Sequence, residues 1–523
     1  MAQVLPIQRQ QQTENSSEYK ILPLAQLADI LQQKRKAKQK IVHAHGVFDV
    51  LHVGHIRHLT EAKSHGDILV VTITADQFVN KGPGRPFFNE HLRAEMLANL
   101  ALVDFVAINH APTAIPVLAA VKPDIYIKGP DYKVMETDIT GKINDEKTEV
   151  EHHGGKIIFT EDITYSSSAL LNRFFDIYPD KLKHYLQQKQ GSDFSEQVMH
   201  YMNKMRDMHV VLVGDTIIDE YMYVAPHERS EKEFMIPTRY LSNEVFAGGV
   251  IAAANHVANF CREVTVISVI GEQNSHEDLI RNSVADNVKL KLITRGQAPT
   301  TRKVRMVDPN NNRKLFEVCY MDDSPLPDDL ARRLQEIIKD QVSRADVTIS
   351  VDFGHGMIYG ETVDVIQEHA RFLAINTQSN SANRGFNLIH KYQRADYVCI
   401  DHSEARLAIA DKYVDLEHMV CTRLPQMLDC PKFIVTCGKN GCATFAPQEG
   451  MANIPAFAET AIDTMGAGDA FLAVTSPLAA TGAPMEVVGF VGNAVGAAKV
   501  GIVGHRKAVD KVAIMKYITA MLK

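Results

Sequence analysis

The sequence predicts an α/β protein built from two doubly wound parallel-sheet domains. Between residues 41 and about 176, short apolar runs alternate with helical patterns, and the alternation starts again at the apolar run 209–213. Strands that alternate with helices are typical of parallel sheets whose faces are covered by helices. The length of 523 residues also exceeds what one ordinary domain occupies.

The expected domain boundaries follow from changes in composition. Residues 1–18 are polar and rich in glutamine, and we expect them to be disordered. The first domain is predicted over residues 19–176 and the second over residues 208–523. Residues 177–207 between them are charged and helical in pattern, so they are predicted to form a linker.

Within the first domain the elements can be assigned in order. One helix is predicted at Glu90–Leu102. Strands are predicted at Ile41–Ala44, Ile68–Thr74, Asp104–Ile108, Ile125–Ile127 and Ile157–Phe159. Ligands of such sheets bind at the carboxyl ends of strands, so the polar segment after the first strand is the first candidate site.

Composition excludes several classes of function. The net charge of -7 shows no basic excess, which argues against a nucleic-acid partner. The seven cysteines include no CxxC pair, so we expect buried, reduced thiols and no zinc site among them. No signal-peptide pattern opens the chain, and no apolar run reaches the ~20 residues of a membrane helix. A cytoplasmic protein that does not enter membranes is expected.

The segment from Gly46 to His55, GVFDVLHVGH, is the most informative stretch of the first domain. His52 and His55 are three residues apart, which places both imidazoles on one side of a helix N-terminus. Unpaired N–H groups there favour an anion such as a nucleoside triphosphate. A metal-binding pair or a merely polar helix start are the alternatives, and the flanking glycines and preceding strand favour the anion.

This segment resembles the HxGH signature of the nucleotidyltransferase superfamily. The resemblance implies a Rossmann-like domain in which His52 and His55 are catalytic. It also implies a set of nucleotide-binding residues, namely Gly46, Phe48, Asp49, Arg93, Lys128, Ser166 and Ser167. Asp49 could instead have a structural role at the turn.

Two later segments extend this resemblance. Lys128–Tyr132, KGPDY, resembles the KGGDY segment of the heptose-1-phosphate adenylyltransferase branch, with Pro130 in place of a glycine. The serines after Tyr165 resemble a late Ser/Thr-rich motif of the family, and their hydroxyls would suit a phosphate. Plain N-capping of a helix is the alternative for these serines.

The implied chemistry needs no nucleophilic side chain. A phosphate oxygen of the sugar phosphate attacks the α-phosphorus of the nucleotide, and pyrophosphate leaves. Positioning and charge stabilisation carry the rate, with His52 and His55 donating to phosphate oxygens. Mg²⁺ is expected to bridge phosphates with few protein ligands, and no metal ligand is assigned in this domain.

The second domain contains DTMGAGDAF at Asp463–Phe471, which resembles the DTxGAGD signature of ribokinase-like (PfkB) sugar kinases. Its glycines allow backbone N–H groups to approach a transferring phosphoryl group at a helix N-terminus. The resemblance implies that Asp469 takes the proton of the attacking sugar hydroxyl.

Smaller motifs lie in the order of this family. Each motif alone indicates a turn or core packing more than a kinase, and it is their ordered occurrence that favours the kinase. The implied nucleotide and phosphate residues are Thr436, Gly438, Gly441, Gly466, Ala467, Gly468 and Asn493, with Glu404 linked to Mg²⁺. The implied sugar residues are Asp215, Asp219, Gly248, Gly249, Asn255, Lys303 and Arg305.

The stretch Pro299–Arg305, PTTRKVR, resembles the PTTxKxR segment of the heptose-7-phosphate kinase branch. Lys303 and Arg305 alternate along a strand, so both can point toward a phosphate already on the substrate, unless the strand is simply cationic and exposed. His355 stands where that branch has a lysine, and residues 376–384 have no assignable counterpart. These departures leave the sugar open.

Together the two halves resemble the bifunctional enzymes of ADP-heptose synthesis, with the transferase first and the kinase second. The resemblance implies ATP and Mg²⁺, a sugar phosphate phosphorylated at its anomeric hydroxyl, and a homo-oligomer formed through the kinase domain. Three alternatives stay open. They are a CTP-dependent transferase paired with a kinase for another sugar or polyol, a chain with one inactive regulatory half, and a nucleotide-sensing scaffold.

Overall fold

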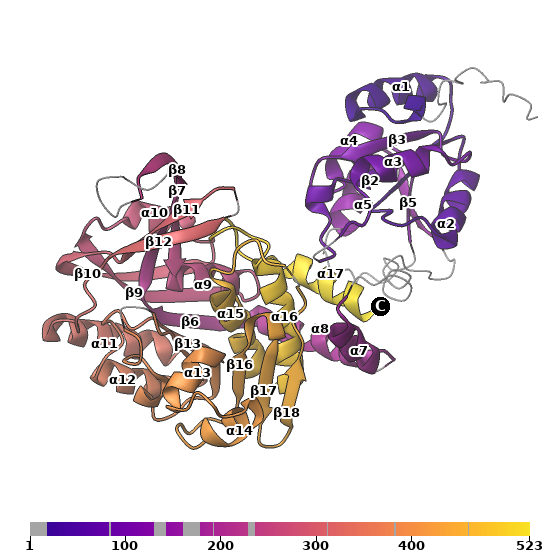
Figure 1. Cartoon of the computed structure of the whole chain (residues 1–523). Helices are drawn as coiled ribbons and strands as arrows, with labels where there is room; N and C mark the ends of the chain where they lie inside the picture. Colours follow the sequence, from indigo (N-terminus) through magenta and orange to yellow (C-terminus); the bar gives the residue numbers. More distant parts are fainter. Residues whose placement is uncertain are drawn as a thin grey trace, which may run out of the picture. The chain divides into compact units, whose positions relative to one another are not determined.

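The computed structural model describes the chain from residue 18 onward as two compact units, Met1–Ile177 and Tyr178–Leu522 (Figure 1). The described residues exclude 1–17, 83–84, 130–142, 161–177, 192, 228–235, 311, 381–382 and 459. The predicted disordered tail therefore lies almost wholly outside the described residues.

The first unit is built on one parallel sheet in the order β3-β2-β1-β4-β5. Its strands are β1 (Ile41–Gly46), β2 (Ile68–Thr74), β3 (Phe105–Asn109), β4 (Ile125–Lys128) and β5 (Lys156–Phe159). β1 lies in the centre, where Val42 is in register with Leu69 on one side and Ile125 on the other. The strand order reverses at β1, and such a switch point is where doubly wound sheets bind ligands.

Helices cover both faces of this sheet. On one face lie α2 (Val53–Ser64) and α3 (Glu90–Ala98). On the other lie α1 (Leu24–Lys36), α4 (Ile115–Val121) and α5 (Ile143–His152). Strands buried on both faces are continuous apolar runs, which is why β2 reads ILVVTIT.

The five predicted strands of the first domain are confirmed, with ends that differ by one or two residues. The predicted helix Glu90–Leu102 begins where expected, because the Asn89 side chain accepts a hydrogen bond from the Leu92 N–H at 3.0 Å. It ends earlier, at Ala98, since the chain turns to enter β3.

The second unit contains a nine-stranded sheet in the order β10-β9-β6-β13-β14-β15-β16-β17-β18. The strands are β6 (His209–Gly214), β9 (Glu263–Gln273), β10 (Val288–Pro299), β13 (Val347–Asp352), β14 (Leu373–Thr377), β15 (Tyr397–Asp401), β16 (Phe433–Thr436), β17 (Cys442–Ala446) and β18 (Gly450–Ile454). All neighbours pair in parallel except the last two pairs, β16–β17 and β17–β18. The predicted parallel α/β architecture is thus confirmed in both units.

Helices again form a layer on each face. One layer consists of α11 (Asp328–Val342), α12 (Glu361–His369) and α13 (His402–Ala408). The opposite layer consists of α9 (Val250–Ala258), α15 (Ala467–Ala480) and α16 (Met485–Lys499), against which α17 (Lys511–Leu522) packs. Shorter helices are Glu18–Lys20, Asp76–Phe78, Met205–Asp207, α10 (Glu277–Ser283), Ile389–Lys391, α14 (Leu416–His418), Met419–Arg423 and Gly438–Asn440.

A smaller sheet of four strands has the order β12-β11-β7-β8. Its strands are β7 (Thr216–Pro226), β8 (Thr238–Gly249), β11 (Arg302–Asp308) and β12 (Arg313–Tyr320). β7 and β11 pair in parallel, which sets Lys303 beside Asp219. The sheet therefore carries acidic and basic side chains on neighbouring strands.

The segment predicted as a linker contributes to the second unit. Its helices α7 (Asp180–Lys189) and α8 (Phe194–Lys204) lie beside α16 and α17 in Figure 1. The Tyr185 hydroxyl donates to Glu486 at 3.0 Å, and the ring of Phe194 packs edge-on against Phe490 at 5.1 Å. The amphipathic segment predicted to be a linker instead packs against the apolar surface of α16.

The cysteines differ from the expectation of burial at three positions, because Cys319 is exposed and Cys421 and Cys437 are half-buried. All seven are free thiols, but Cys319 is exposed on β12, where the edge position of this strand leaves it uncovered. Across the described part of the chain, no helix is long and apolar enough to cross a membrane.

Replacement of Phe194 tests whether α8 stabilises the second unit. We expect Phe194→Ala to lower the unfolding free energy of this unit by about 3 kcal/mol, because a buried aromatic side chain is lost from a packed contact. Differential scanning calorimetry of the full chain measures this as a shift of one transition. Gln197→Ala, an exposed position of the same helix, is the control. Equal transitions for both variants would show that α8 is dispensable.

Candidate active sites

His52 and His55 meet at the junction between β1 and α2. His52 is the N-cap of α2, and its Nδ1 accepts a hydrogen bond from the Gly54 N–H at 3.1 Å. The two imidazole centroids are 3.9 Å apart, and the His55 ring packs against Phe48 at 5.2 Å. A side chain at Gly46 would crowd the Phe48 ring at 3.1 Å. The strand end, the turn and the helix start thus hold both histidines in fixed positions.

The surroundings of the two histidines lower the pKa of both imidazoles. Burial, followed by the influence of His52, lowers the pKa of His55 to about 3, and burial and Lys81 lower the pKa of His52. Both imidazoles are therefore neutral near pH 7. His52 Nε2 and His55 Nδ1 are buried without a hydrogen-bond partner. A phosphate would supply the missing partners and raise both pKa values.

The Asp49 side chain binds the segment that contains Arg85, Phe87 and Phe88. Its carboxylate accepts hydrogen bonds from the N–H groups of Phe87 at 2.7 Å and Phe88 at 3.1 Å. It also pairs with Arg85 at 3.2 Å. These contacts favour the structural role at the turn over a role in positioning the histidines.

Arg93 lies in the protein interior. Its guanidinium donates to the carbonyl oxygens of Val47 at 2.6 Å, Thr74 at 2.9 Å and Phe88 at 2.9 Å, and it pairs with Asp76. The side chain is fully buried, and its N–H donors are occupied by these backbone carbonyl oxygens and by Asp76. The expected direct contact with a nucleotide does not follow from this placement, because Arg93 instead clamps the segment that leads to His52.

Lys128 ends β4, the strand next to β1, and therefore lies at the switch point of the sheet. Its ammonium pairs with Glu146 of α5 at 2.7 Å, and Glu146 also accepts a hydrogen bond from Tyr126 at 3.2 Å. This arrangement holds the lysine at the carboxyl edge of the sheet. Ser166 and Ser167 lie outside the described residues.

A cleft of about 610 Å³ in the second unit brings most of the predicted kinase residues together. Those lining it are Asp219, Gly249, Lys303, Arg305, Glu404, Thr436, Gly438, Gly441, Gly466, Ala467, Gly468, Asp469 and Asn493. They come from both sheets and from the N-terminus of α15. Such a size and mixed lining suit a small polar ligand together with a nucleotide.

Asp469 lies in the first turn of α15, after the glycine turn. Gly466 there has a φ of 70°, and a Cβ would lie 2.7 Å from the His505 ring, so only glycine fits without displacement. Burial raises the pKa of Asp469, while His505 and a hydrogen bond from Gln378 act in the opposite direction. A buried carboxylate with a raised pKa has the property required of a general base.

Asp219 forms a compact charged group with His505 and Arg305. Burial alone would raise the pKa of Asp219, but the His505 hydrogen bond and the Arg305 charge hold it at about 2. His505 Nε2 lies 3.1 Å from the carboxylate. Arg305 also pairs with Glu317 at 2.8 Å, so two carboxylates balance its charge. A Cβ on Gly248 would lie 2.2 Å from Asp219, which explains the glycine.

Lys303 has a different environment from Arg305, although both are buried and point to the same cleft. Its side chain is 8% exposed, which contradicts an exposed cationic strand. No hydrogen bond or ion pair of its ammonium occurs with any described residue. Of the two predicted phosphate ligands, Lys303 is thus the one whose ammonium forms no ion pair with a described residue.

Three predicted sugar residues, Asp215, Gly248 and Asn255, do not line the cleft, although Gly248 lies against Asp219, which does. Asp215 accepts hydrogen bonds from the N–H groups of Phe353 at 3.0 Å and His355 at 3.4 Å, and burial followed by Asp352 raises its pKa to about 7. Asn255 donates to the Ser283 carbonyl at 2.8 Å and thereby fastens the end of α10. The side chains of Asp215 and Asn255 are committed to neighbouring loops, so their predicted contact with sugar is not supported.

The end of the cleft that is predicted to bind nucleotide is shaped by backbone. Gly441 has a φ of 89°, and a Cβ would lie 2.0 Å from the Ile454 carbonyl oxygen. Asn493 donates to the carbonyls of Ile454 at 3.1 Å and Pro455 at 2.9 Å. These contacts keep the end of β18 against the loop after β16, where Thr436 lines the cleft.

Glu404 and Asn376 offer oxygen atoms to a cation. The Glu404 carboxylate accepts the Ser379 N–H at 2.8 Å and caps α13 together with Asp401. Burial raises its pKa to about 7. The Oδ1 of Asn376 is buried in the structure without a partner. Carboxylate and amide oxygens on one cleft wall fit Mg²⁺, which prefers oxygen ligands and retains several waters.

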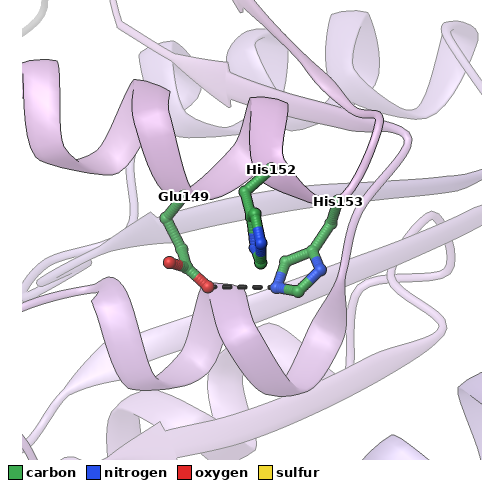
Figure 2. A group of neighbouring side chains, drawn as sticks. All are labelled: Glu149, His152 and His153. Atoms are coloured by element: carbon green, nitrogen blue, oxygen red, sulfur yellow. Dashed lines mark hydrogen bonds and ion pairs between the residues drawn. The ribbon is translucent and has the colours of Figure 1, made fainter.

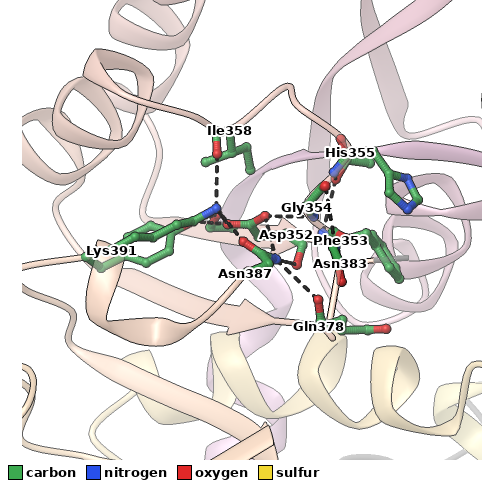
Figure 3. A network of polar contacts seen from close by, with 12 residues as sticks. Asp352, Phe353, Gly354, His355, Ile358, Gln378, Asn383, Asn387 and Lys391 are labelled. Atoms are coloured by element: carbon green, nitrogen blue, oxygen red, sulfur yellow. Dashed lines mark hydrogen bonds and ion pairs between the residues drawn. The ribbon is translucent and has the colours of Figure 1, made fainter. Parts of the chain in front are cut away.

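Gln378 is a site residue that the sequence did not indicate. Its side chain donates to Asp469, and its carbonyl accepts a hydrogen bond from Asn387 at 3.2 Å. Asn387 also donates to Asp352, which pairs with Lys391 (Figure 3). The stretch without a family counterpart therefore holds the predicted base. Only its position directly after a buried strand could have signalled this role.

Lys499 is a second residue near the site that the sequence did not indicate. It is fully buried in α16 and donates to the carbonyls of Met465 and Gly504, both at 2.8 Å. These bonds tie the glycine turn to the segment that carries His505. A lone lysine in an apolar helix gives no signal in the sequence, because its acceptors are backbone atoms far along the chain.

Comparison with known proteins defines the class of the chain. A sequence model described as the pfkB family of carbohydrate kinases matches residues 207–511, more than half of the chain, and the chain belongs to this family. A cytidylyltransferase-like family matches residues 43–173. The predicted order, a nucleotidyltransferase segment before a kinase segment, is confirmed.

The first segment is similar to proteins named bifunctional protein HldE. The protein from Helicobacter pylori (strain J99) is 38% identical over 161 residues, which is 30% of this chain and 32% of that protein. The protein from Syntrophotalea carbinolica is 34% identical over 155 residues, 29% and 30% of the two chains. The chain thus matches about a third of the length of these relatives.

Solved structures resemble the second unit. Phosphofructokinase-2 from Escherichia coli in complex with fructose-6-phosphate has 14% identity and a TM-score of 0.48, covering 60% of this chain and 100% of its own. Ribokinase from Arabidopsis thaliana complexed with ribose and ATP has 17% identity and a TM-score of 0.45, covering 61% and 99%.

Replacement of Gln378 tests its role as a positioning residue. Loss of its hydrogen bond removes an interaction that lowers the pKa of Asp469, so this pKa rises in Gln378→Ala. The acid limb of the pH–rate profile for phosphoryl transfer should then move to higher pH, because the base must be deprotonated. We expect kcat to fall about tenfold, the effect of one charge-assisted hydrogen bond.

Gln335→Ala, which removes a hydrogen bond to Thr362 on the far helix layer, is the matched control and should keep the wild-type profile. A lower kcat with an unmoved acid limb in Gln378→Ala would assign Gln378 a purely structural role.

Proposed function

We propose that the chain is a bifunctional enzyme of nucleotide-sugar synthesis. Its second unit would use ATP to phosphorylate the anomeric hydroxyl of a sugar phosphate, with heptose 7-phosphate as the first candidate. The product would carry two phosphates, and a separate phosphatase would have to remove the older one. The first unit would then join a nucleotide to the sugar 1-phosphate and release pyrophosphate. The observation that carries the proposal is one cleft that holds both the buried carboxylate of Asp469 and the ammonium of Lys303, which has no ion pair with a described residue.

The kinase step follows from the arrangement of the cleft. The sugar hydroxyl gives its proton to Asp469 as its oxygen attacks the γ-phosphorus of ATP, and ADP leaves. The N–H groups of the turn at Gly466–Gly468 receive the developing charge at the start of α15. Glu404 and Asn376 are the residues that would hold Mg²⁺, which supplies charge neutralisation on the phosphates.

The nucleotidyl transfer uses the first unit. An oxygen of the sugar 1-phosphate attacks the α-phosphorus, the new P–O bond forms, and the bond to pyrophosphate breaks. His52 and His55 donate hydrogen bonds through the ring nitrogens that lack partners, and they gain protons as the phosphates approach. Lys128 at the neighbouring strand end adds positive charge at the same edge of the sheet.

A second candidate function pairs the kinase with a CTP-dependent transferase for another sugar or polyol phosphate. The match of residues 43–173 to a cytidylyltransferase-like family favours testing it. The name of the relatives, bifunctional protein HldE, supports two activities on one chain. A cytoplasmic location and a homo-oligomer through the kinase unit stay predictions.

Product mass spectrometry of the purified chain tests the proposal. The chain is given heptose 7-phosphate with ATP and Mg²⁺, then heptose 1-phosphate with ATP or CTP separately. A heptose bisphosphate and ADP-heptose are the expected products. A CDP-sugar alone would favour the second candidate, and nucleotide binding without any product would identify a sensing scaffold.

Single substitutions should separate the two activities. Asp469→Asn removes the predicted base and should lower phosphoryl transfer by at least about 100-fold. His55→Ala removes a donor to the phosphates and should lower nucleotidyl transfer by about 100-fold. Each variant is the control for the other, because each should keep the activity of the unaltered unit. Loss of both activities in either variant would refute the two-site arrangement.

Lys303 should determine the preference for a phosphorylated sugar. We expect Lys303→Met to raise the KM for the sugar phosphate about 10–100-fold, since one charged hydrogen-bond partner of the phosphate is lost. The KM for ATP should not change. Lys291→Met, at an exposed position of β10, serves as control. An unchanged KM for the sugar phosphate would exclude Lys303 from the phosphate subsite.

A further inference from the structure

Three metal-ligating side chains meet at the C-terminal end of α5 in the first unit. Glu149, His152 and His153 each offer one ligand atom, and these atoms lie within 4.8 Å of one another. Figure 2 shows the three side chains converging on one side of the helix end. We propose that this group binds a transition-metal ion of the Zn²⁺ type, independently of both activities proposed above.

The distances suit such an ion. With metal–ligand bonds of about 2.0 Å, neighbouring ligand atoms of a tetrahedral zinc site lie about 3.3 Å apart. Glu149 Oε1 and His153 Nε2 are already 3.0 Å apart. His152 is exposed, so its imidazole can close the remaining gap by a change of side-chain torsion. A water molecule would complete the four-coordinate shell.

The backbone that carries the ligands is fixed before any ion arrives. The N–H groups of His153 and Gly155 both donate to the Val150 carbonyl, at 3.2 Å and 3.0 Å. Val150 is buried in the core between α4, α5 and the sheet. A Cβ at Gly155 would lie 2.2 Å from the Pro123 carbonyl oxygen, so this turn is tightly enclosed. Binding therefore orders side chains and not backbone, which limits its entropic cost.

The charge of the site also favours a cation. The last turn of a helix exposes carbonyl groups and the negative end of the helix dipole. Glu149 adds a carboxylate there. A simple i,i+4 pair would account for Glu149 and His153, but it gives no role to His152, which makes no hydrogen bond with any described residue.

The ligand types select the metal. Two imidazole nitrogens and one carboxylate oxygen suit Zn²⁺, Ni²⁺ or Cu²⁺, whereas Mg²⁺ prefers oxygen ligands and water. The site should thus be distinct from the Mg²⁺ that accompanies nucleotides. Since Glu146 on the same helix holds Lys128, an ion bound at the end of α5 should stabilise the first unit.

The experiment uses the full chain, stripped with EDTA and then titrated with Zn²⁺ or Mg²⁺ by isothermal calorimetry. We expect one Zn²⁺ site that is lost in His152→Ala/His153→Ala, with affinity lowered at least tenfold, and no Mg²⁺ binding that depends on these residues. Even outer partners of metal ligands change metal affinity about 10–100-fold, so loss of two ligands must exceed tenfold. His91→Ala, an exposed histidine of α3, is the matched control.

Two further measurements complete the test. Zn²⁺ should raise the calorimetric transition of the first unit in the wild type and in His91→Ala, but not in the double variant. Glu149→Gln should bind Zn²⁺ more weakly while its metal-free transition stays near that of the wild type. Equal Zn²⁺ affinity in wild type and the double variant would overturn the proposal, and so would equal losses in His91→Ala and the double variant.

Discussion

Burial of the Asp469 carboxylate is the constraint on which the cleft of the second unit depends. A carboxylate buried in the first turn of a helix needs compensating partners, because burial favours its neutral form. His505 and Gln378 supply these partners, and Lys499 ties the adjoining glycine turn to the segment of His505. Each partner comes from a different part of the chain, so the base is formed only when the layers of this unit have packed.

In the first unit, burial acts on imidazoles instead of a carboxylate and lowers their pKa values. Burial keeps His52 and His55 neutral. Their Nε2 and Nδ1 atoms, respectively, have no hydrogen-bond partner among the described residues and could bind an anion. Arg93 and Asp49 do not compete for that partner, because backbone groups and the side chains of Asp76 and Arg85 occupy their hydrogen-bonding groups. Charged residues that contact the scaffold therefore hold the candidate site, and its two histidines are neutral, whereas Lys128 at the neighbouring strand end is paired with Glu146.

Residues expected from motifs lie close together where glycine or backbone geometry defines the local structure. Gly466, Gly468 and Asp469 fall together because one turn leads directly into one helix. Side chains were less predictable. Lys303 and Arg305 follow the same alternation along β11, but Arg305 is neutralised by Asp219 and Glu317, whereas Lys303 is not.

The sequence by itself determined the two parallel-sheet units, their order, and the turns that carry His52, His55 and Asp469, since strand periodicity and glycine turns are local properties. Only the tertiary structure decided which polar side chains are left for a ligand. That choice depends on partners distant in the sequence, as for Asp215, which bonds to the N–H group of Phe353. It also decided that α7 and α8 cover the second unit, because an amphipathic pattern does not specify the surface it buries.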